Sequence, residues 1–287
     1  MDSETINHMF FDILNTRNIF LIKEYILQFS PDLNTLFTCD SSLTAENGVY
    51  KGYTPLTFIL CPRNGGDEFA WNAWDTWSEE CSDNTKANRL AKKNDLENMY
   101  LITKLLVSHG ANVNYVVKTG RRLDIETTAL VQAIFLGHLR IIKFLVDSGA
   151  DIHLKINGGY NAITYASSAD VKIVAYLLEK GADPNNHGCP QTPLCSAAEY
   201  NDTALAKILL NYGAYVTDDA LESTPVYLAR MNDSKKMMDI LLDEYKKYFT
   251  STKSILRYLE PENLWCILRK LTGGEIEDSE IKSVVYE

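Results

Sequence analysis

Apolar residues recur every three or four positions along much of this chain, which is the spacing of one face of an α-helix. Near the start, this pattern predicts one helix over residues 6–14 and a second helix over residues 19–29. Polar residues 15–18 separate the two helices, and Pro31 ends the second one. Similar pairs of short amphipathic helices follow, so the pattern predicts an all-α protein.

One phrase occurs four times, each time at the end of a predicted helix. It is LLVSHGANVN, FLVDSGADIH, YLLEKGADPN and ILLNYGAYVT, and its glycines are Gly110, Gly149, Gly181 and Gly213. The last two intervals between these glycines are 32 residues each, and the first is 39. A fixed period in this range is typical of a repeat architecture. The backbone just past a helix needs a left-handed residue, which Gly adopts without steric cost, so we expect a positive φ at Gly181 and Gly213.

A second phrase precedes these copies. It is TPL, TAL, NAI, TPL and TPV, and it starts at Thr54, Thr128, Asn161, Thr192 and Thr224. Thr caps a helix through its hydroxyl, and Pro fits the first helical turn, where its missing N–H costs nothing. The distance from Thr128 to Gly149 is 21 residues, as is that from Thr192 to Gly213. Each unit is therefore predicted to contain a turn, a short helix, a tight turn, a second helix and a Gly stop.

The combination of cap, Gly stop and period resembles the ankyrin repeat over roughly residues 50–250. The resemblance implies an all-α ankyrin-repeat solenoid of helix-turn-helix units, with helical caps and an insertion in an early repeat. The sequence departs from the family pattern in three ways. The usual His after TPL is absent, the Gly-His between the helices is kept only as Gly137-His138, and the stretch 164–173 is one residue short.

The repeat that opens at Thr54 is interrupted. Its first helix is expected to stop at Cys61, and its second helix is expected only at residues 98–107, so we assign residues 62–97 as an insertion. Insertions in repeat proteins often lie on the binding face. The insertion carries Trp71, Trp74 and Trp77, which would share one face of a helix. Either these tryptophans dock the insertion on its own repeats, or they contact a partner.

The linker of residues 115–126 is longer than its equivalents and accounts for the 39-residue interval. Lys118, Arg121 and Arg122 make it basic in an otherwise acidic protein. One interpretation is a solvated turn, and the other is a contact with an acidic partner or with the acidic insertion.

Three parts follow from these patterns. Residues 1–49 form an N-terminal helical cap or degenerate repeat, residues 50–249 hold the ankyrin repeats, and residues 250–287 form a C-terminal helical cap with an acidic tail. The sequence PENLWCILRKL at residues 261–271 resembles the core of an F-box, although the spacing from Leu264 to Ile267 is one residue short. A plain helical cap and a segment that recruits a ubiquitin ligase are both consistent with it.

The net charge of −10 excludes a general nucleic-acid binder, because binding to phosphates needs a clustered positive surface. No run of about 18 apolar residues predicts a membrane span, and the N-terminus lacks the basic region of a secretory signal. The six cysteines are scattered, which is typical of free thiols in a reducing compartment. We therefore expect a cytoplasmic protein.

Chemistry-bearing motifs are scarce. His187, Cys189 and Cys195 lie close in sequence but lack the paired spacings of zinc sites. The chain has no GxSxG, no phosphate-binding Gly loop and no HExxH. We therefore expect no catalytic residue, metal, cofactor or small-molecule substrate, although an enzyme with its site in the insertion remains an alternative.

The ankyrin resemblance implies that a protein partner binds the concave face, which the loops before TPL and the ends of the first helices form. Carried over residue by residue, this face comprises Tyr50, Lys51, Tyr53, Phe135, Leu136, Tyr160, Gln191, Glu199, Tyr200 and Met231. Many of these side chains are aromatic or large and apolar, as in binding hot spots. The predicted site also includes Trp71, Trp74 and Trp77, with Arg121 and Arg122 at its rim. The predicted function is a scaffold for protein–protein interaction; the alternatives are a ubiquitin-ligase substrate adaptor, either in its own cell or delivered into a host, and an enzyme.

Overall fold

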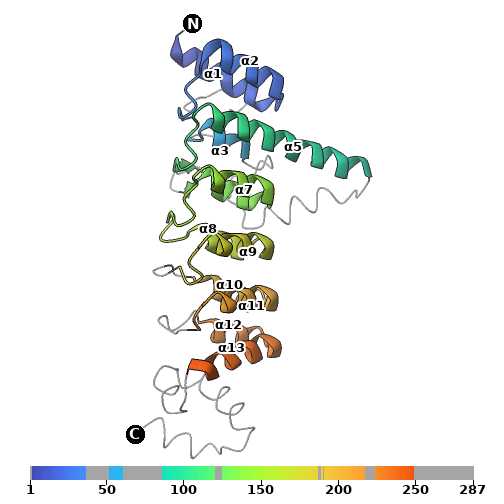
Figure 1. Ribbon diagram of the computed structural model, residues 1–287, viewed down its shortest axis with the longest axis vertical. Helices are drawn as coiled ribbons and strands as arrows, with labels where there is room; N and C mark the ends of the chain where they lie inside the picture. The colour runs from blue at the N-terminus through green and yellow to red at the C-terminus, as the bar shows by residue number, and fades with distance from the viewer. Residues whose placement is uncertain are drawn as a thin grey trace, which may run out of the picture. The chain divides into compact units, whose positions relative to one another are not determined.

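The computed structural model in Figure 1 describes residues 2–36, 52–60, 86–119, 125–186, 189, 191–216 and 224–248. The chain divides into two compact units, Met1–Asn157 and Gly158–Glu287, and each unit is described by itself. Both units are built from pairs of helices that follow one another along the chain, which confirms the predicted all-α repeat architecture.

The first unit has two layers of helices. Its first layer contains α1 (Ser3–Asn15), α3 (Pro55–Leu60) and α6 (Ala129–Phe135), and its second layer contains α2 (Ile19–Phe29), α5 (Lys86–Ser108) and α7 (Leu139–Asp147). Each helix packs on its own partner and on the next helix of its layer. The pair α1 and α2 has the bounds that the apolar pattern near the N-terminus predicts to within a few residues.

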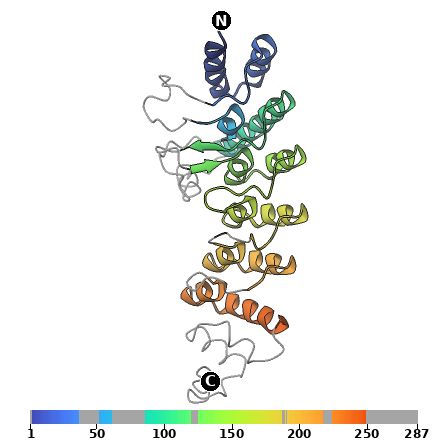
Figure 2. The same ribbon diagram turned by 90° about the vertical axis from the view of Figure 1, so that its left-hand side faces the viewer.

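The second unit repeats this arrangement. Its first layer contains α8 (Ala162–Ser167), α10 (Pro193–Glu199) and α12 (Pro225–Met231), and its second layer contains α9 (Val171–Glu179), α11 (Thr203–Asn211) and α13 (Lys235–Tyr248). The edge-on view in Figure 2 separates the two layers. The core lies between them, where Leu177 and Leu209 are fully buried. Burying one Leu side chain contributes about 1.5–3 kcal/mol to folding.

A side-chain cap starts each first helix of the repeats. Thr128, Asn161, Thr192 and Thr224 each accept a hydrogen bond from the backbone N–H three residues later. Thr54 does the same for Thr57, with a nitrogen–oxygen distance of 3.3 Å. Losing one such cap costs about 0.5–2 kcal/mol. The second phrase of the sequence thus marks where these helices begin.

Glycine ends the second helix of each complete repeat. Gly181 has a φ of 91° and Gly213 a φ of 87°, which confirms the expected left-handed stop. The next residue then turns back, so that the Ala182 N–H donates to the Leu177 carbonyl at 2.9 Å, as Ala214 does to Leu209. These bonds satisfy carbonyls that would otherwise lack a partner at the helix end.

Asparagine amides join successive repeats. The Asn114 side chain donates to the Gly149 carbonyl at 2.9 Å and accepts from the Asp151 N–H at 2.8 Å. In the second unit, Asn185 makes the same two bonds, to the Gly213 carbonyl at 3.2 Å and from the Tyr215 N–H at 2.8 Å. Asn34 bridges to the repeat that ends at Gly110 in this way too. Each amide therefore fixes the spacing between two neighbouring turns.

The repeat that starts at Asn161 is one residue short, as the sequence indicates. Its first helix, α8, has six residues, whereas α6 and α10 have seven. Elsewhere the turn between the two helices contains one left-handed residue, with φ values of 65° at Gly137, 54° at Asn201 and 48° at Asp233. The turn at residues 168–170 has three residues like the others, but none of them has a positive φ.

Two elements differ from the sequence-based expectation. The second helix of the interrupted repeat begins at Lys86 and not at Asn98, because polar residues 86–97 extend α5 to 23 residues. The linker contains two strands, β1 (Val117–Thr119) and β2 (Ile125–Thr127), which pair antiparallel with Lys118 opposite Glu126. Figure 2 shows this hairpin on the side of the short helices α3 and α6.

Candidate protein-binding surface

The strongest part of the predicted surface lies at the C-terminal ends of α10 and α12. Tyr200 follows α10 and is 60% exposed, and Met231 ends α12 and is 64% exposed. The two helices pack against each other within the second unit, so these two large side chains lie on adjacent helix ends. Large exposed apolar groups next to each other are typical of an interaction site.

An amide clamp holds these two helix ends together. The side-chain nitrogen of Asn232, the residue after Met231, donates to the backbone carbonyls of Ala198 and Glu199 at 3.2 and 2.7 Å. One turn further on, the Ser234 hydroxyl donates to the side-chain oxygen of Asn201. The backbone next to Tyr200 and Met231 is therefore fixed before any partner arrives, and a preorganised surface loses less entropy on binding.

Polar groups flank the two large side chains. Gln191, just before the cap of α10, donates to the carboxylate of Glu199 at 2.5 Å. Glu199 is exposed, and it occupies on α10 the place that Met231 occupies on α12. The structure thus places Gln191 beside Glu199, with Tyr200 and Met231 at the ends of two neighbouring helices.

Tyr160 joins this group only in part. Its ring packs on that of Tyr165, with centroids 5.7 Å apart and a tilt of 37°, and the residue is half-buried. Burial raises the pKa of the Tyr160 hydroxyl, and the nearby Cys189 and Glu199 raise it further. Tyr160 therefore contributes to the packing of its own repeat as well as to the surface beside Glu199.

The predicted residues of the first unit are less exposed. Phe135 and Leu136, at the end of α6, are half-buried. Tyr53 is 3% exposed, so the expectation that it contacts a partner is wrong. It precedes the buried cap Thr54 and leads into α3, which packs against α1, α5 and α6. A side chain beside this central helix lies in the core rather than on a face.

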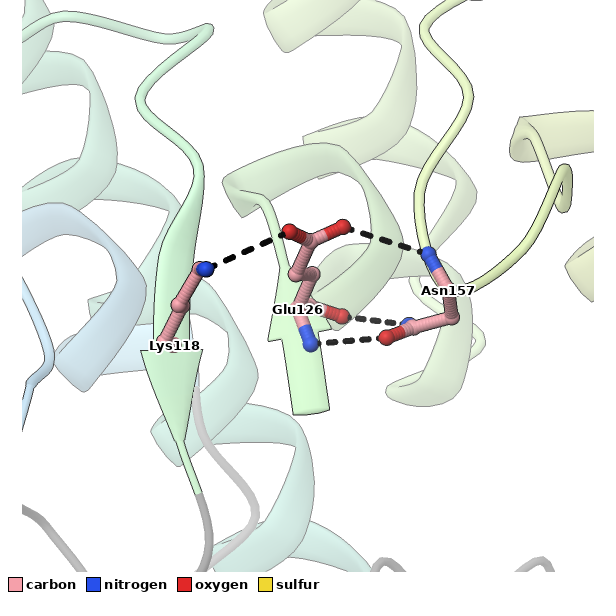
Figure 3. A network of polar contacts seen from close by, with 3 residues as sticks. All are labelled: Lys118, Glu126 and Asn157. Carbon is pink, nitrogen blue, oxygen red and sulfur yellow. Dashed lines mark hydrogen bonds and ion pairs between the residues drawn. The ribbon is translucent and has the colours of Figure 1, made fainter. Parts of the chain in front are cut away.

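The hairpin of the linker is anchored by an asparagine (Figure 3). The Glu126 N–H donates to the side-chain oxygen of Asn157 at 2.7 Å, and the Asn157 amide donates to the Glu126 carbonyl at 2.6 Å. The Glu126 carboxylate accepts from the Asn157 N–H at 3.3 Å and lies 3.9 Å from the Lys118 ammonium. Lys118 thus has an acidic neighbour within its own hairpin, which lowers the positive charge of that surface.

Several predicted residues lie outside the described parts of the chain. They are Tyr50, Lys51, Trp71, Trp74, Trp77, Arg121 and Arg122. The segment from residue 61 to residue 85 and the F-box-like segment at residues 261–271 lie outside them too. Their roles therefore stay predictions.

Sequence reasoning missed the contacts that hold the extension of α5. Asp95 pairs with Arg17 in the turn between α1 and α2, and Glu97 pairs with Arg140 of α7 at 2.5 Å. The Arg140 guanidinium also lies 3.9 Å from the centre of the Tyr100 ring, where a cation is attracted to the ring face. The opposite charges at these positions were visible in the sequence, but the extended helix that brings them together was not.

His138 lies next to this network and caps α7. Its ring nitrogen Nδ1 accepts from the Ile141 N–H at 3.2 Å, which requires the neutral ring. Burial lowers the pKa of His138; Glu97 opposes this effect, and Arg140 adds to it.

Within the residues that the structure describes, no three His, Cys, Asp or Glu side chains gather as a metal site would require. Cys195 is buried in α10 and accepts a hydrogen bond from the Thr192 hydroxyl, so its sulfur belongs to the helix cap. None of the described helices is both long and apolar enough to cross a membrane.

Known proteins share the repeats of this chain. A family of ankyrin repeats (three copies) matches residues 89–188 and 165–252, which together span more than half of the chain. A protein of Danio rerio whose name describes a palmitoyltransferase, ZDHHC13, is 28% identical over 178 residues, which is 58% of this chain and 27% of that protein. An ankyrin repeat protein of Fowlpox virus, FPV115, is 33% identical over 94 residues, which is 32% of this chain and 15% of the viral protein.

Two further proteins are similar to parts of this chain. The ankyrin repeat protein R664 of Acanthamoeba polyphaga mimivirus is 35% identical over 83 residues, which is 26% of this chain and 51% of the viral protein. The E3 ubiquitin-protein ligase Ufd4 of Drosophila melanogaster is 32% identical over 112 residues, or 38% of this chain and 4% of the ligase. The chain thus spans between about a twentieth and a half of the length of these relatives.

Proposed function

Because this chain belongs to the ankyrin-repeat family, whose repeats are generally modules for protein–protein interaction, we propose that it binds a partner protein through the C-terminal ends of α10 and α12. The observation that carries the proposal is the exposure of Tyr200 and Met231 on adjacent helix ends, 60% and 64%. Their large side chains would enter pockets of the partner and supply most of the binding energy.

The polar neighbours give this surface its specificity. Glu199 holds a negative charge beside Tyr200, and Gln191 orients its carboxylate. A partner with a basic or hydrogen-bond-donating group next to an apolar patch fits this arrangement best, because a charge that loses water at an interface needs a partner. The clamp of Asn232 supports the proposal, since it fixes the two helix ends in the free protein.

The proposed mechanism is binding without catalysis. Ankyrin-repeat proteins are typically not enzymes, and the residues gathered here, one carboxylate with tyrosine, glutamine and methionine, suit recognition. The predicted contribution of Trp71, Trp74, Trp77, Arg121 and Arg122 belongs to the same proposal as further partner contacts.

Affinity capture from the cells that express the protein tests this function. The full chain is compared with a variant carrying Tyr200→Ala and Met231→Ala, and captured proteins are identified by mass spectrometry. The matched control is Tyr212→Ala, because Tyr212 is 47% exposed after α11 in the other helix layer. A partner that the wild type and the control retain and the double variant loses supports the proposal. Equal capture by all three proteins contradicts it.

The role of the insertion needs a separate variant. Because α5 begins at Lys86, residues 62–85 can be replaced by a short Gly-Ser turn while the ion pairs of Asp95 and Glu97 stay in place. We expect a folded helical protein with altered partner choice, measured by circular dichroism and by the same capture. Loss of folding would assign the insertion to the core.

The alternative function, as a substrate adaptor of a ubiquitin ligase, is tested in the same affinity-capture samples. The likeness to the ligase Ufd4 covers only 4% of that protein, so it supports shared repeats and no more. Copurification of a ligase subunit that depends on residues 261–271 would favour an adaptor.

A further inference from the structure

The outer face of α2 carries large apolar side chains where α7, α9, α11 and α13 carry charged, polar or small ones. Phe20 is 78% exposed and Leu27 is 65% exposed. Both lie seven residues apart on α2, and two turns of a helix bring such residues onto one face. They point away from the buried side of α2, which contains Ile22, Tyr25 and Ile26.

A position-by-position comparison shows how unusual these two residues are. Phe20 is the second residue of its helix. The second residues of α7, α9 and α13 are Arg140, Lys172 and Lys236, all exposed, and that of α11 is the small Ala204. Leu27 is the ninth residue, and the ninth residues of α7, α9, α11 and α13 are Asp147, Glu179, Asn211 and Asp243, all exposed. At these sites the helices α7, α9, α11 and α13 thus carry charged, polar or small residues, whereas α2 carries large apolar ones.

The position of α2 in the stack accounts for the exposure of Leu21 but not for that of Phe20 and Leu27. Leu21 is 46% exposed, whereas its equivalents Ile141, Ile173 and Leu205 are at most 1% exposed. Within the described residues no helix pair covers the side of α2 that carries Leu21. An end repeat normally turns a polar face to water. Here Phe20 and Leu27 form one apolar face, which we call the α2 face, and Leu21 lies about 100° away around the helix.

Charges on the α2 face select its occupant. Lys23 and Glu24 are exposed and lie on opposite sides of the line from Phe20 to Leu27, about 50° to either side. If a second α2 packs on this face in parallel about a two-fold axis, each Lys23 meets the Glu24 of the other copy. In an antiparallel pair the same symmetry would put Lys23 against Lys23 and Glu24 against Glu24. The face is therefore complementary to itself in one orientation.

We propose that the α2 face binds a second copy of the chain, with the two α2 helices parallel about a two-fold axis. Phe20 meets Phe20 and Leu27 meets Leu27 at the centre, and two Lys23–Glu24 pairs flank them. A self-complementary patch of this kind is how two-fold dimers form. The contact is small, so we expect weak and reversible association. It uses a different surface from the proposed partner site and does not depend on it.

Sedimentation equilibrium of the full chain from about 1 to 500 μM measures this association, since interfaces of this size are weak. We expect a monomer–dimer equilibrium for the wild type. Phe20→Arg with Leu27→Asp gives α2 the residues of α7, and it should raise the dissociation constant about a hundredfold or more, because each substitution enters the interface twice. Both residues are exposed, so folding should persist, and circular dichroism checks it. Tyr212→Arg, at a 47% exposed residue just after α11, should leave the equilibrium unchanged.

Charge exchange tests the orientation. Lys23→Glu alone and Glu24→Lys alone should each weaken self-association, because they place like charges together across the axis. The double exchange should restore it, and an equimolar mixture of the two single variants should form a heterodimer. A wild type that stays monomeric, or dimers that survive Phe20→Arg with Leu27→Asp, would overturn the proposal. Single charge variants that associate as well as the wild type would overturn the parallel arrangement.

Discussion

The second helices of two repeats, α11 and α5, are held in place by different kinds of contact. Helix α11 has nine residues, starts at the cap Asp202 and is followed by Gly213, whose carbonyl accepts from Asn185. Helix α5 has 23 residues, and Asp95 and Glu97 in its N-terminal half form ion pairs with Arg17 and Arg140. The regular repeat depends on neutral hydrogen bonds and a buried apolar face, whereas the extension depends on ion pairs.

This difference shows how a repeat tolerates extra chain. The buried residues of α5, such as Met99, Ile102 and Leu106, lie in its C-terminal half and keep the repeat register up to Gly110. The extra residues lengthen the helix at its N-terminal end. Two ion pairs then orient the extension. The exposed pair of Arg140 and Glu97 contributes little to overall stability, whereas the Arg17 side chain of the other pair is only 11% exposed. The core and the extension should therefore respond very differently to mutation and to salt.

The regular repeats should be most sensitive at the Gly stop. Gly181→Val should lower the free energy of unfolding by about 1–3 kcal/mol, because a β-branched residue is strained at a φ of 91°. No atom lies within 4 Å of a Cβ built there, so the effect comes from the backbone alone. Urea unfolding measures it. An unchanged midpoint would show that the backbone relaxes into another conformation at no cost.

Removal of an asparagine amide that joins two repeats should have the next largest effect. Asn185→Ala leaves the Gly213 carbonyl and the Tyr215 N–H without this partner and should cost about 1–2 kcal/mol. Asn114→Ala removes the same two contacts in the first unit and is the matched comparison. Similar losses at both positions are expected in thermal unfolding. A loss at only one of them would mean that the bridge is not a general device of these repeats.

A mutation that removes an ion pair of the α5 extension should lower the free energy of unfolding much less. Arg140→Met removes the pair with Glu97 and should cost less than about 1 kcal/mol, and the difference from the wild type should shrink as salt is raised. Unfolding at low and high sodium chloride measures both effects. A cost as large as that of Asn185→Ala, or one that salt does not change, would contradict the contrast between the two helices.

The smallest effect is a pH dependence at His138. Its pKa is lowered in the folded state, mainly by burial, so the unfolded chain binds a proton more readily. This contribution to stability is present above the ordinary His pKa of about 6.5 and is lost as the pH falls from there toward the lower folded-state pKa. His138→Asn keeps a side-chain cap without the proton, so its stability should fall less than that of the wild type between neutral and mildly acidic pH. Identical pH profiles would refute this role.

The sequence predicted the repeat core well because each of its signals has a local cause. Thr192 caps a helix and Gly213 ends one, and both act through their own backbone. Tyr53 was mispredicted because the residue type does not tell which neighbours cover it; three helices pack around α3. The start of α5 at Lys86 was missed because its extension has a polar sequence, without an apolar stripe to mark it.

Part of the candidate surface, like part of the repeat core, could be located from the sequence. The exposed ends of α10 and α12, with Tyr200 and Met231, could be located because the caps Thr192 and Thr224 fix their repeat positions; that they bind a partner stays a proposal. The clamp of Asn232 could not be foreseen, since it depends on how closely α12 packs on α10. The apolar residues of α2 were visible in the sequence. Only the exposure of their side chains in the structure distinguishes Phe20 and Leu27 from core residues of the same type.

Calorimetric titration of the captured partner into the chain tests the central claim most directly. Tyr200→Ala with Met231→Ala should weaken binding by at least about 2 kcal/mol, because both side chains are expected to be anchors of the interface. The thermal midpoint should barely move, since both are largely exposed. Tyr212→Ala should bind as the wild type does. Unchanged affinity of the double variant, with a folded protein and an active partner, would contradict the claim that α10 and α12 carry the binding surface.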